Sequence, residues 1–238
     1  MSQVSISPDI NAKDECLRSL SNSFEDSSPQ EILRWANDKF GRNTALATGF
    51  GAEGCALVSM LAEINPNARF FYLDTDLLFP ETYRLRDTLE QKYGIKFERK
   101  AAELSLKEQA EKYGEKLWEH NPNLCCQLRK VEPLKQMLSG LTAWITAIRR
   151  DQSPARTNAG IVERDKKFGI IKINPLAGWT TREVWQYIIK NEVPYNTLHD
   201  RNYPSIGCVP CTSPVQIGEN ARSGRWRGQI KTECGLHQ

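Results

Sequence analysis

The chain has 238 residues, a length that suits one α/β domain with a substantial core. Its formal net charge of +3 is too small to indicate nucleic-acid binding, although it leaves room for a local basic site. No apolar run approaches the roughly 20 residues that span a bilayer, and the first residues do not resemble a secretory signal. We therefore expect a cytoplasmic protein without membrane or nucleic-acid partners, in which the seven cysteines stay reduced.

The predicted elements alternate along the chain. Residues 1–26 are rich in Ser, Asn and Asp and predict a mobile arm or a weakly packed helix. Ser28, Pro29 and Glu31 then predict the start of a capped helix. Further β-type runs and helical stretches follow in turn at 44–50, 55–65, 68–75, 80–94, 95–100, 105–120, 126–139, 142–150, 168–176 and 180–192. This alternation predicts βαβ units with a mainly parallel sheet, and an irregular stretch beyond Asn191.

A glycine-rich loop, "TGFGAEG" (48–54), joins the first strand to the next helix. Its glycines permit close backbone approach, and the helix N-terminus offers free N–H groups to an anion. The loop is neither a Walker A motif nor a dinucleotide fingerprint, and a purely structural turn is the alternative. Its place after the first strand of an α/β sheet favours ligand binding. The candidate contacts are Gly49, Phe50, Gly51, Ala52 and Glu53.

Two other strand ends carry polar side chains. Asp74 and Thr75 leave the second strand and are candidates for contact with a ribose or base, although such a pair also makes ordinary turns. Arg149, Arg150 and Asp151 end a later strand. Arginines at this position can bind a phosphate or sulfate group with forked geometry, and a solvated charge run is the alternative.

Four cysteines form two tight pairs about 80 residues apart, in "LCCQLRK" (124–130) and "GCVPCTSP" (207–214). Neighbouring side chains on a helix diverge by roughly 100°, which is awkward around a single tetrahedral ion. A cubane presents separate irons that two neighbouring thiolates can reach. The pattern therefore favours one [4Fe–4S] cluster over zinc, on Cys125, Cys126, Cys208 and Cys211; the alternative is buried small residues and a chance turn.

The last stretch, "ARSGRWRGQIKTECGLHQ", surrounds Cys234 with cationic side chains: Arg222, Arg225, Arg227, Lys231 and His237. Positive surroundings favour the thiolate form and its approach to an anionic substrate, while the adjacent Glu233 works against them. Cys234 is therefore a candidate nucleophile, the alternative being an incidental terminal cysteine. Cys16 and Cys55 look like packing or incidental residues.

The motifs "GFGAEG", "LDTDLLFPETY", "CCQLRK", "RRDQSP", "CVPC" and "ECGLH" occur in this order. Together they resemble the assimilatory adenylyl-sulfate and phosphoadenylyl-sulfate reductase family, in its iron–sulfur cluster-bearing branch. The resemblance runs from about residue 28 to the C-terminus. It implies an adenine nucleotide α-hydrolase-like (PP-loop type) fold, with a nucleotide-binding reductase domain over 27–205 and a cluster loop with a catalytic tail over 206–238.

The resemblance also implies an activity. Adenylyl sulfate would be reduced to sulfite and AMP through an S-sulfonate on Cys234, with thioredoxin or a similar dithiol as donor, in sulfate assimilation and cysteine biosynthesis. Lys130 matches the family lysine between cluster and substrate, and Arg222, Arg225 and His237 match the residues that clamp the phosphosulfate. Use of phosphoadenylyl sulfate, alone or as well, stays open, as does assembly into a homo-oligomer.

Two rival interpretations are weaker. An ATP-using relative on the same fold, such as a sulfur-inserting tRNA enzyme or a sulfurylase subunit, would carry a Ser-Gly-Gly-x-Asp-Ser type of loop. "TGFGAEG" lacks both the Asp and the final Ser. A zinc-stabilised nucleic-acid-binding protein is disfavoured by the mild net charge and by the lack of a basic helix.

Overall fold

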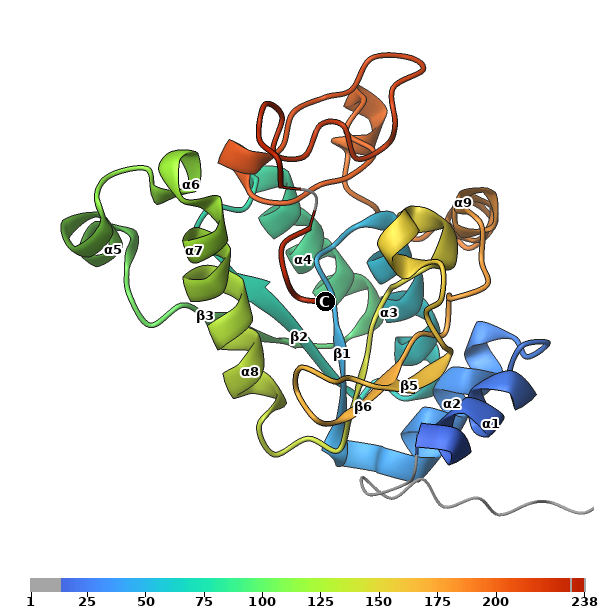
Figure 1. Cartoon of the computed structure of the whole chain (residues 1–238). Helices are drawn as coiled ribbons and strands as arrows, with labels where there is room; N and C mark the ends of the chain where they lie inside the picture. Colours follow the sequence, from blue (N-terminus) through green and yellow to red (C-terminus); the bar gives the residue numbers. More distant parts are fainter. Residues whose placement is uncertain (1–13, 232, 238) are drawn as a thin grey trace, which may run out of the picture.

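A mainly parallel sheet runs through the protein in the computed structural model, which describes residues 14–231 and 233–237 (Figure 1). Within these residues its six strands are β1 (Thr44–Ala47), β2 (Arg69–Asp74), β3 (Phe97–Ala101), β4 (Ala143–Ile145), β5 (Val162–Arg164) and β6 (Ile171–Ile173). Their spatial order is β3-β2-β1-β4-β6-β5, and only the β5–β6 pairing is antiparallel. The predicted α/β class is confirmed. Strand β5 was not predicted, because Val-Glu-Arg contains a single apolar residue.

The helices lie close to their predicted positions. They are α1 (Asp14–Ser23), α2 (Pro29–Phe40), α3 (Ala52–Ile64), α4 (Pro80–Tyr93), α5 (Leu106–Tyr113), α6 (Leu117–His120), α7 (Pro122–Cys126), α8 (Glu132–Leu138) and α9 (Thr181–Lys190). The expected helical stretch over 105–120 is interrupted at Gly114, whose φ of 87° suits glycine. A π-helical turn, Gln127–Val131, joins α7 to α8. No helix in the described part of the chain is long and apolar enough to cross a bilayer.

Side chains alternate between the two faces of the sheet, so both faces are covered. Leu46 and Ile145 point into the larger core, together with residues of α2, α3 and α9. Ala45 and Trp144 point to the opposite face, where they pack with residues of α8 and with Leu236 near the C-terminus. Figure 1 shows the corresponding layers, with α8 on one side of the strands and α2, α3 and α9 on the other.

Helix α3 is buried almost all round, as expected for a helix without a polar face. Its Cys55 is fully buried in the larger core, and burial raises the pKa of this thiol. Cys16 in α1 is exposed. Cys55 is therefore a packing residue, as the sequence suggested, and it is separate from the other thiols.

The N-terminal region was predicted as a mobile arm or a weakly packed helix. Residues 1–13 lie outside the described residues, while α1 packs through Leu17 and Leu20. Ser21 Oγ accepts hydrogen bonds from the backbone N–H groups of Ile161 and Val162 at 2.8 and 3.3 Å. Residues 14–23 are thus a helix attached to the β5 edge of the sheet.

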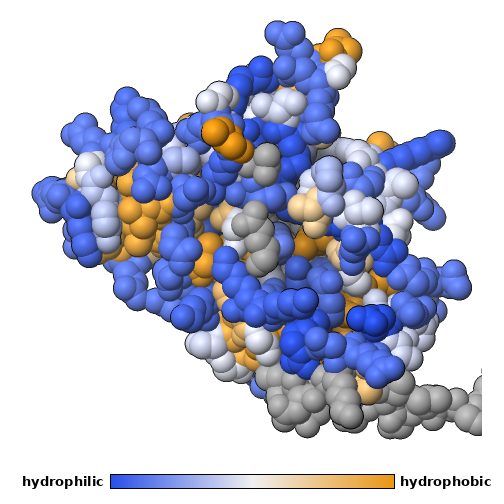
Figure 2. Space-filling model, in the orientation of Figure 1, coloured by the Kyte–Doolittle hydropathy of each residue, from blue (hydrophilic) through white to orange (hydrophobic). Residues whose placement is uncertain are grey.

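The strand order creates a natural binding crevice. After β1 the chain builds β2 and β3 on one side, and then returns to build β4 and β6 on the other. The loops therefore diverge at the carboxyl ends of β1 and β4, where open α/β sheets bind ligands. The orange and red C-terminal loops lie over this end of the sheet (Figure 1). The face shown in Figure 2 is mostly hydrophilic, with hydrophobic side chains in separate patches.

Candidate active site

A cavity of about 380 Å³ lies at the carboxyl ends of β1, β2 and β4. We call it the main cavity. The C-terminal tail, residues 233–237, forms part of its wall together with the loops near 205 and 222. The residues predicted for the site that line it are Gly49, Gly51, Glu53, Thr75, Lys130, Arg149, Asp151, Arg222, Arg225, Cys234 and His237. The structure thus gathers most of the predicted set in one place.

The glycine-rich loop is held in shape by Thr48, whose Oγ1 accepts a hydrogen bond from Phe50 N at 2.9 Å. A Cβ atom on Gly54 would lie 2.5 Å from this hydroxyl, so glycine is needed there. Helix α3 starts after Gly51 without a side-chain cap. Its first N–H groups are therefore available to an anion in the cavity.

Two residues of this loop do not line the cavity. Phe50 is only 1% exposed, and its ring packs edge-on against Tyr72 and Phe97 in the larger core. Its φ of 59° turns the side chain away from the loop's open face. Ala52 is buried in the same core. For these two residues, only backbone atoms remain candidates for substrate contact.

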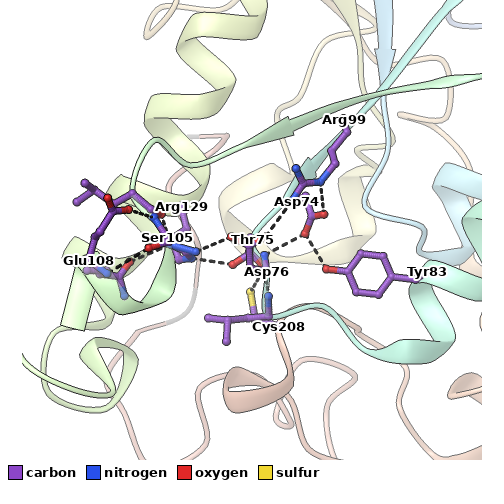
Figure 3. A network of polar contacts seen from close by, with 12 residues as sticks. Asp74, Thr75, Asp76, Tyr83, Arg99, Ser105, Glu108, Arg129 and Cys208 are labelled. Atoms are coloured by element: carbon purple, nitrogen blue, oxygen red, sulfur yellow. Dashed lines mark hydrogen bonds and ion pairs between the residues drawn. The ribbon is translucent and has the colours of Figure 1, made fainter. Parts of the chain in front are cut away.

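Asp74 and Arg150 also lie outside the cavity. Asp74 accepts hydrogen bonds from Tyr83 Oη at 2.7 Å and Arg99 Nε at 2.6 Å, so its carboxylate points toward these side chains (Figure 3). Arg150 forms a two-pronged ion pair with Glu25 at 2.6 and 2.8 Å. A motif at a strand end does not reveal which way each side chain points, so the sequence could not separate these residues from their neighbours.

Arg149 lines the main cavity, but each nitrogen of its guanidinium already has a hydrogen-bond partner. Its Nε and Nη2 lie 3.0 and 2.9 Å from Glu53 Oε1, and its Nη1 pairs with Asp151. Nη2 also donates to Thr181 Oγ1 at 3.0 Å. Arg149 therefore holds Glu53 beside the glycine loop and has little capacity left for a ligand anion.

Glu233 was expected to work against the positive charge around Cys234, and its side chain lies within that charge. The Glu233 carboxylate pairs with Arg156 and Arg222 at 3.0 and 3.1 Å. Arg156 was missed at the sequence level, because nothing in "RRDQSPAR" distinguishes it from a surface arginine. Arg227 and Lys231 turn elsewhere, to Glu219 and Asn123 respectively.

Arg225 is fitted closely into the wall. A Cβ atom on Gly207 would lie 2.2 Å from its Nη2, so glycine makes room for the guanidinium. Arg225 donates to Cys211 O at 3.3 Å, and its guanidinium lies 4.5 Å from the ring of Trp226. Since Arg225 pairs with no carboxylate among the described residues, its positive charge is available to an anion in the cavity.

Four aromatic or imidazole groups in the cavity wall have buried nitrogen atoms without a hydrogen-bond partner among the described residues: Trp144, His199, Trp226 and His237. Buried polar atoms are normally satisfied, so these nitrogens suit a site completed by ligand or water. Trp144, His199 and Trp226 were not predicted as site residues, because the sequence does not distinguish an aromatic residue at a binding site from one buried in the core.

The tail is docked by several contacts. His237 stacks on Trp144 with ring centroids 5.5 Å apart, and Leu236 packs into the smaller core. Lys167 Nζ donates to Gly235 O at 2.6 Å. These contacts place Cys234 at the wall of the main cavity.

The four predicted ligand cysteines line a second, smaller cavity, which we call the thiol cavity. Burial, reinforced by the neighbouring sulfurs, raises the pKa of Cys125 to about 12 and that of Cys211 to about 11. Val209 N donates to Leu77 O at 2.7 Å, which ties the loop of Cys208 to the segment after β2. Among the described residues, no three His, Cys, Asp or Glu side chains lie close enough to ligate one ion.

Lys130 and Thr75 line both cavities and therefore separate them. Burial opposes the charge on Lys130, but the nearby Cys208 and Cys234 sulfurs outweigh it and raise its pKa. Thr75 Oγ1 lies 3.3 Å from Cys208 Sγ. Lys130 was predicted to lie between a cluster and the substrate, and in the structure it lies between the thiol cavity and the main cavity.

Arg129 fastens the π-helical turn to the end of β2. Its Nε donates to Thr75 O at 2.7 Å, Nη2 pairs with Asp76 at 2.7 Å, and Nη1 donates to Leu104 O at 3.1 Å. Figure 3 shows this guanidinium between the two segments, and the residue is only 1% exposed. Arg129 thus sets the position of its neighbour Lys130 and of the helix that carries Cys126.

Comparison with known proteins agrees with this geometry. The phosphoadenosine phosphosulfate reductase domain matches residues 43–214. The chain belongs to this family. The match spans the glycine loop and all four cysteines of the thiol cavity, and the tail follows it.

The relatives of this reductase-family chain include an adenosine 5′-phosphosulfate reductase of Salinibacter ruber, 50% identical over 222 residues, 93% of this chain and 88% of that protein. Adenosine 5′-phosphosulfate reductase 2 of Bacillus subtilis is 53% identical over 209 residues, 87% and 89% of the two chains. A phosphoadenylyl-sulfate reductase from Candida auris, solved with phosphate, has a TM-score of 0.76 at 35% identity and covers 86% of this chain and 98% of its own.

The fold itself extends beyond the family. An FMN adenylyltransferase from Candida glabrata, solved with FAD and pyrophosphate, has a TM-score of 0.56 at 14% identity, over 87% of this chain and 75% of that one. This likeness concerns the fold alone. Together with the C. auris reductase, it confirms the predicted adenine nucleotide α-hydrolase-like fold.

Replacing Arg129 with Met should lower the free energy of unfolding by about 2–4 kcal/mol, because the carbonyl oxygens of Thr75 and Leu104 lose their buried donor. Asp76 keeps its ion pair with Arg99. Urea unfolding measures the change. Arg227→Met is the control, since its partner Glu219 lies at the surface. Equal losses in the two variants would contradict the anchoring role of Arg129.

Docking of the tail should weaken in acid. Burial, together with Lys172, Arg156 and Arg222, holds the pKa of His237 well below its ordinary value of 6.5. In a released tail the His237 imidazole takes up a proton below pH 6.5, whereas in the docked tail it stays neutral. The equilibrium constant for docking should therefore fall about tenfold between pH 7.5 and 5.5. Hydrogen-exchange protection of the tail, corrected for intrinsic exchange at each pH, measures this. His237→Phe should remove the pH dependence while keeping the stack on Trp144; an unchanged dependence would contradict the assignment.

Proposed function

We propose that this chain reduces adenylyl sulfate to sulfite and AMP, with Cys234 as the nucleophile. The observation that carries the proposal is the position of Cys234 in one cavity with the glycine loop and three cations, Lys130, Arg222 and Arg225. This cavity lies at the carboxyl edge where α/β sheets bind nucleotides. The high identity to proteins named adenosine 5′-phosphosulfate reductases supports this substrate.

In the proposed complex the phosphate end of the nucleotide lies against the glycine loop and the start of α3. The sulfate group points toward Cys234. A thiolate and a sulfate repel each other, and this repulsion raises the barrier to attack. Lys130, Arg222, Arg225 and a donor nitrogen of His237 would offset the repulsion, most strongly where water is excluded.

The reaction has two stages. The Cys234 thiolate attacks the sulfate sulfur, the bond from that sulfur to the bridging phosphate oxygen breaks, and AMP leaves. Cys234 then carries an S-sulfonate. A thiolate of the donor attacks Cys234 Sγ, the bond between the two sulfurs of the S-sulfonate breaks, and sulfite leaves with its electron pair. The second donor thiol resolves the mixed disulfide and restores Cys234, so the dithiol supplies both electrons.

The donor is a dithiol protein such as thioredoxin. A thiol near the end of the chain can serve a buried substrate and then an external protein, if the tail alternates between docked and released states. The identity to proteins named adenosine 5′-phosphosulfate reductases supports a part in sulfate assimilation and cysteine biosynthesis, which we place in the cytoplasm. In this proposal residues 27–205 bind the nucleotide and residues 206–238 supply the cluster loop and the catalytic tail.

Cys125, Cys126, Cys208 and Cys211 would hold one [4Fe–4S] cluster. All four thiols line one small cavity. The adjacency of Cys125 and Cys126 supports a cubane over zinc, because neighbouring thiolates can reach separate irons. When bound, the cluster polarises the site and anchors the loop that carries Cys208 and Cys211.

Phosphoadenylyl sulfate is the alternative substrate, and the likeness to the C. auris reductase favours it. Its 3′-phosphate would need further cationic partners. Of the remaining described cations of the cavity wall, Arg149 is held by Glu53 and Asp151, and Arg156 lies with Arg222 at the anion site beside Cys234. We therefore favour adenylyl sulfate.

Replacing Cys234 with Ser should reduce sulfite release to background, because a hydroxyl is a far weaker nucleophile than a thiolate. Iron content, measured on anaerobically purified protein, should stay at about four per chain, since Cys234 is not a proposed ligand. Cys208→Ser should lose iron. Retained turnover in Cys234→Ser would contradict the mechanism, and stoichiometric zinc without iron would contradict the cluster.

The substrate is tested by comparing kcat/KM for adenylyl sulfate and phosphoadenylyl sulfate with thioredoxin as donor. We expect adenylyl sulfate to be favoured at least about tenfold, because a desolvated 3′-phosphate without a cationic partner costs binding energy. A preference for the 3′-phosphorylated nucleotide would show that the chain is a phosphoadenylyl-sulfate reductase.

A further inference from the structure

Glu233, the residue before Cys234, holds two arginines at once. Its Oε2 accepts a hydrogen bond from Arg156 Nη2 at 3.0 Å and forms an ion pair with Arg222 Nη2 at 3.1 Å. Its Oε1 lies 3.3 Å from Ser153 Oγ, which donates to it. Only 9% of the Glu233 side chain is exposed. Charge-assisted bonds in such a shielded place are stronger than surface pairs.

The partners of this carboxylate come from separate segments that border the main cavity. Ser153 and Arg156 belong to the loop after β4, and Arg222 to the C-terminal loop. Glu233 ties both loops to the tail. The other described contacts of the tail, such as the His237 stack and the Lys167 hydrogen bond, involve no pair of opposite charges.

The arginines need an anion between them. Arg222 is partly buried beside Arg156 and Arg225, and burial followed by these like charges lowers its pKa despite Glu233. In the substrate-free chain the Glu233 carboxylate supplies the negative charge. A phosphate or sulfate group also accepts paired hydrogen bonds from guanidinium donors, and adenylyl sulfate carries two such anionic groups side by side, so it can compete with the carboxylate for these arginines.

We propose that Glu233 is the positioning residue of the tail and an internal substitute for the substrate anion. In the free enzyme its carboxylate holds Arg156 and Arg222 and keeps Cys234 at the cavity. When substrate arrives, its anionic group takes over these guanidinium groups and Glu233 releases them. The exchange rests on the proposed function, because it requires an anionic group next to Cys234; the docking role does not.

The docking role is tested without nucleotide. Cys234 of the holoenzyme is alkylated with iodoacetamide, and peptide mass mapping follows its rate with the exposed Cys16 as internal reference. Glu233→Gln should react about tenfold faster at Cys234, because the tail loses its charged pair. Glu233→Asp keeps the charge but is one methylene too short to hold both arginines, and should also react faster. Glu219→Gln, which removes an ion pair with Arg227 away from the tail, should match the wild type.

The exchange is tested by calorimetric binding of adenylyl sulfate in a Cys234→Ser background, where no turnover occurs. Glu233→Gln should bind the nucleotide several-fold more tightly, because the substrate no longer competes with a carboxylate. A purely structural role predicts weaker binding, since the wall of the cavity would loosen. Glu219→Gln should bind as the Cys234→Ser parent does.

Each outcome is decisive. Unchanged alkylation of Cys234 in both Glu233 variants would overturn the docking role, and unchanged or weaker nucleotide binding would overturn the exchange. If adenylyl sulfate binds to none of the variants, the proposed function fails. The alkylation result would still decide whether Glu233 docks the tail.

Discussion

Among the described residues, five Lys and Arg side chains gather around the main cavity, and their mutual repulsion is the constraint on which the site depends. Three carboxylates in the same wall relieve it: Glu53 and Asp151 hold Arg149, and Glu233 holds Arg156 and Arg222. Lys130 and Arg225 pair with no carboxylate in the described residues, so the cavity keeps a positive potential. A fixed positive potential attracts an anionic substrate and stabilises charge that develops when a thiolate meets a sulfate.

The two cavities share a wall, so the thiol cluster and the reacting thiol are mechanically linked. Thr75 and Lys130 face both, and Arg129 fixes the turn between them to the end of β2. In the proposed complex, a change in the thiol cavity would reach the substrate through Lys130. The proposed cluster would then have a structural part in the reaction without contact between its cysteines and the substrate.

The fold was largely predictable because apolar runs and capping signals are local. The capping box at Ser28 and Glu31 has the predicted hydrogen bonds, and each predicted strand is present in the structure. Strand β5 is present without having been predicted. The cysteines of the thiol cavity were also found from their spacing. The direction of a side chain was harder to predict from sequence. Phe50 and Asp74 lie in motifs predicted to bind substrate, but their side chains pack against Phe97 and Tyr83 instead of facing the main cavity. The roles of Arg156 and Glu233 depend on contacts between residues 77 apart, which no local pattern encodes.

The central claim is that the Cys234 thiol attacks the sulfate group of adenylyl sulfate. Its most direct test is mass spectrometry of the protein after incubation with adenylyl sulfate and no reductant. The account predicts release of one AMP per active chain and one added sulfonate group, mapped to the peptide that carries Cys234 and removed by thioredoxin. Release of AMP and sulfite from a chain whose Cys234 stays unmodified, or a sulfonate on another cysteine, would contradict it.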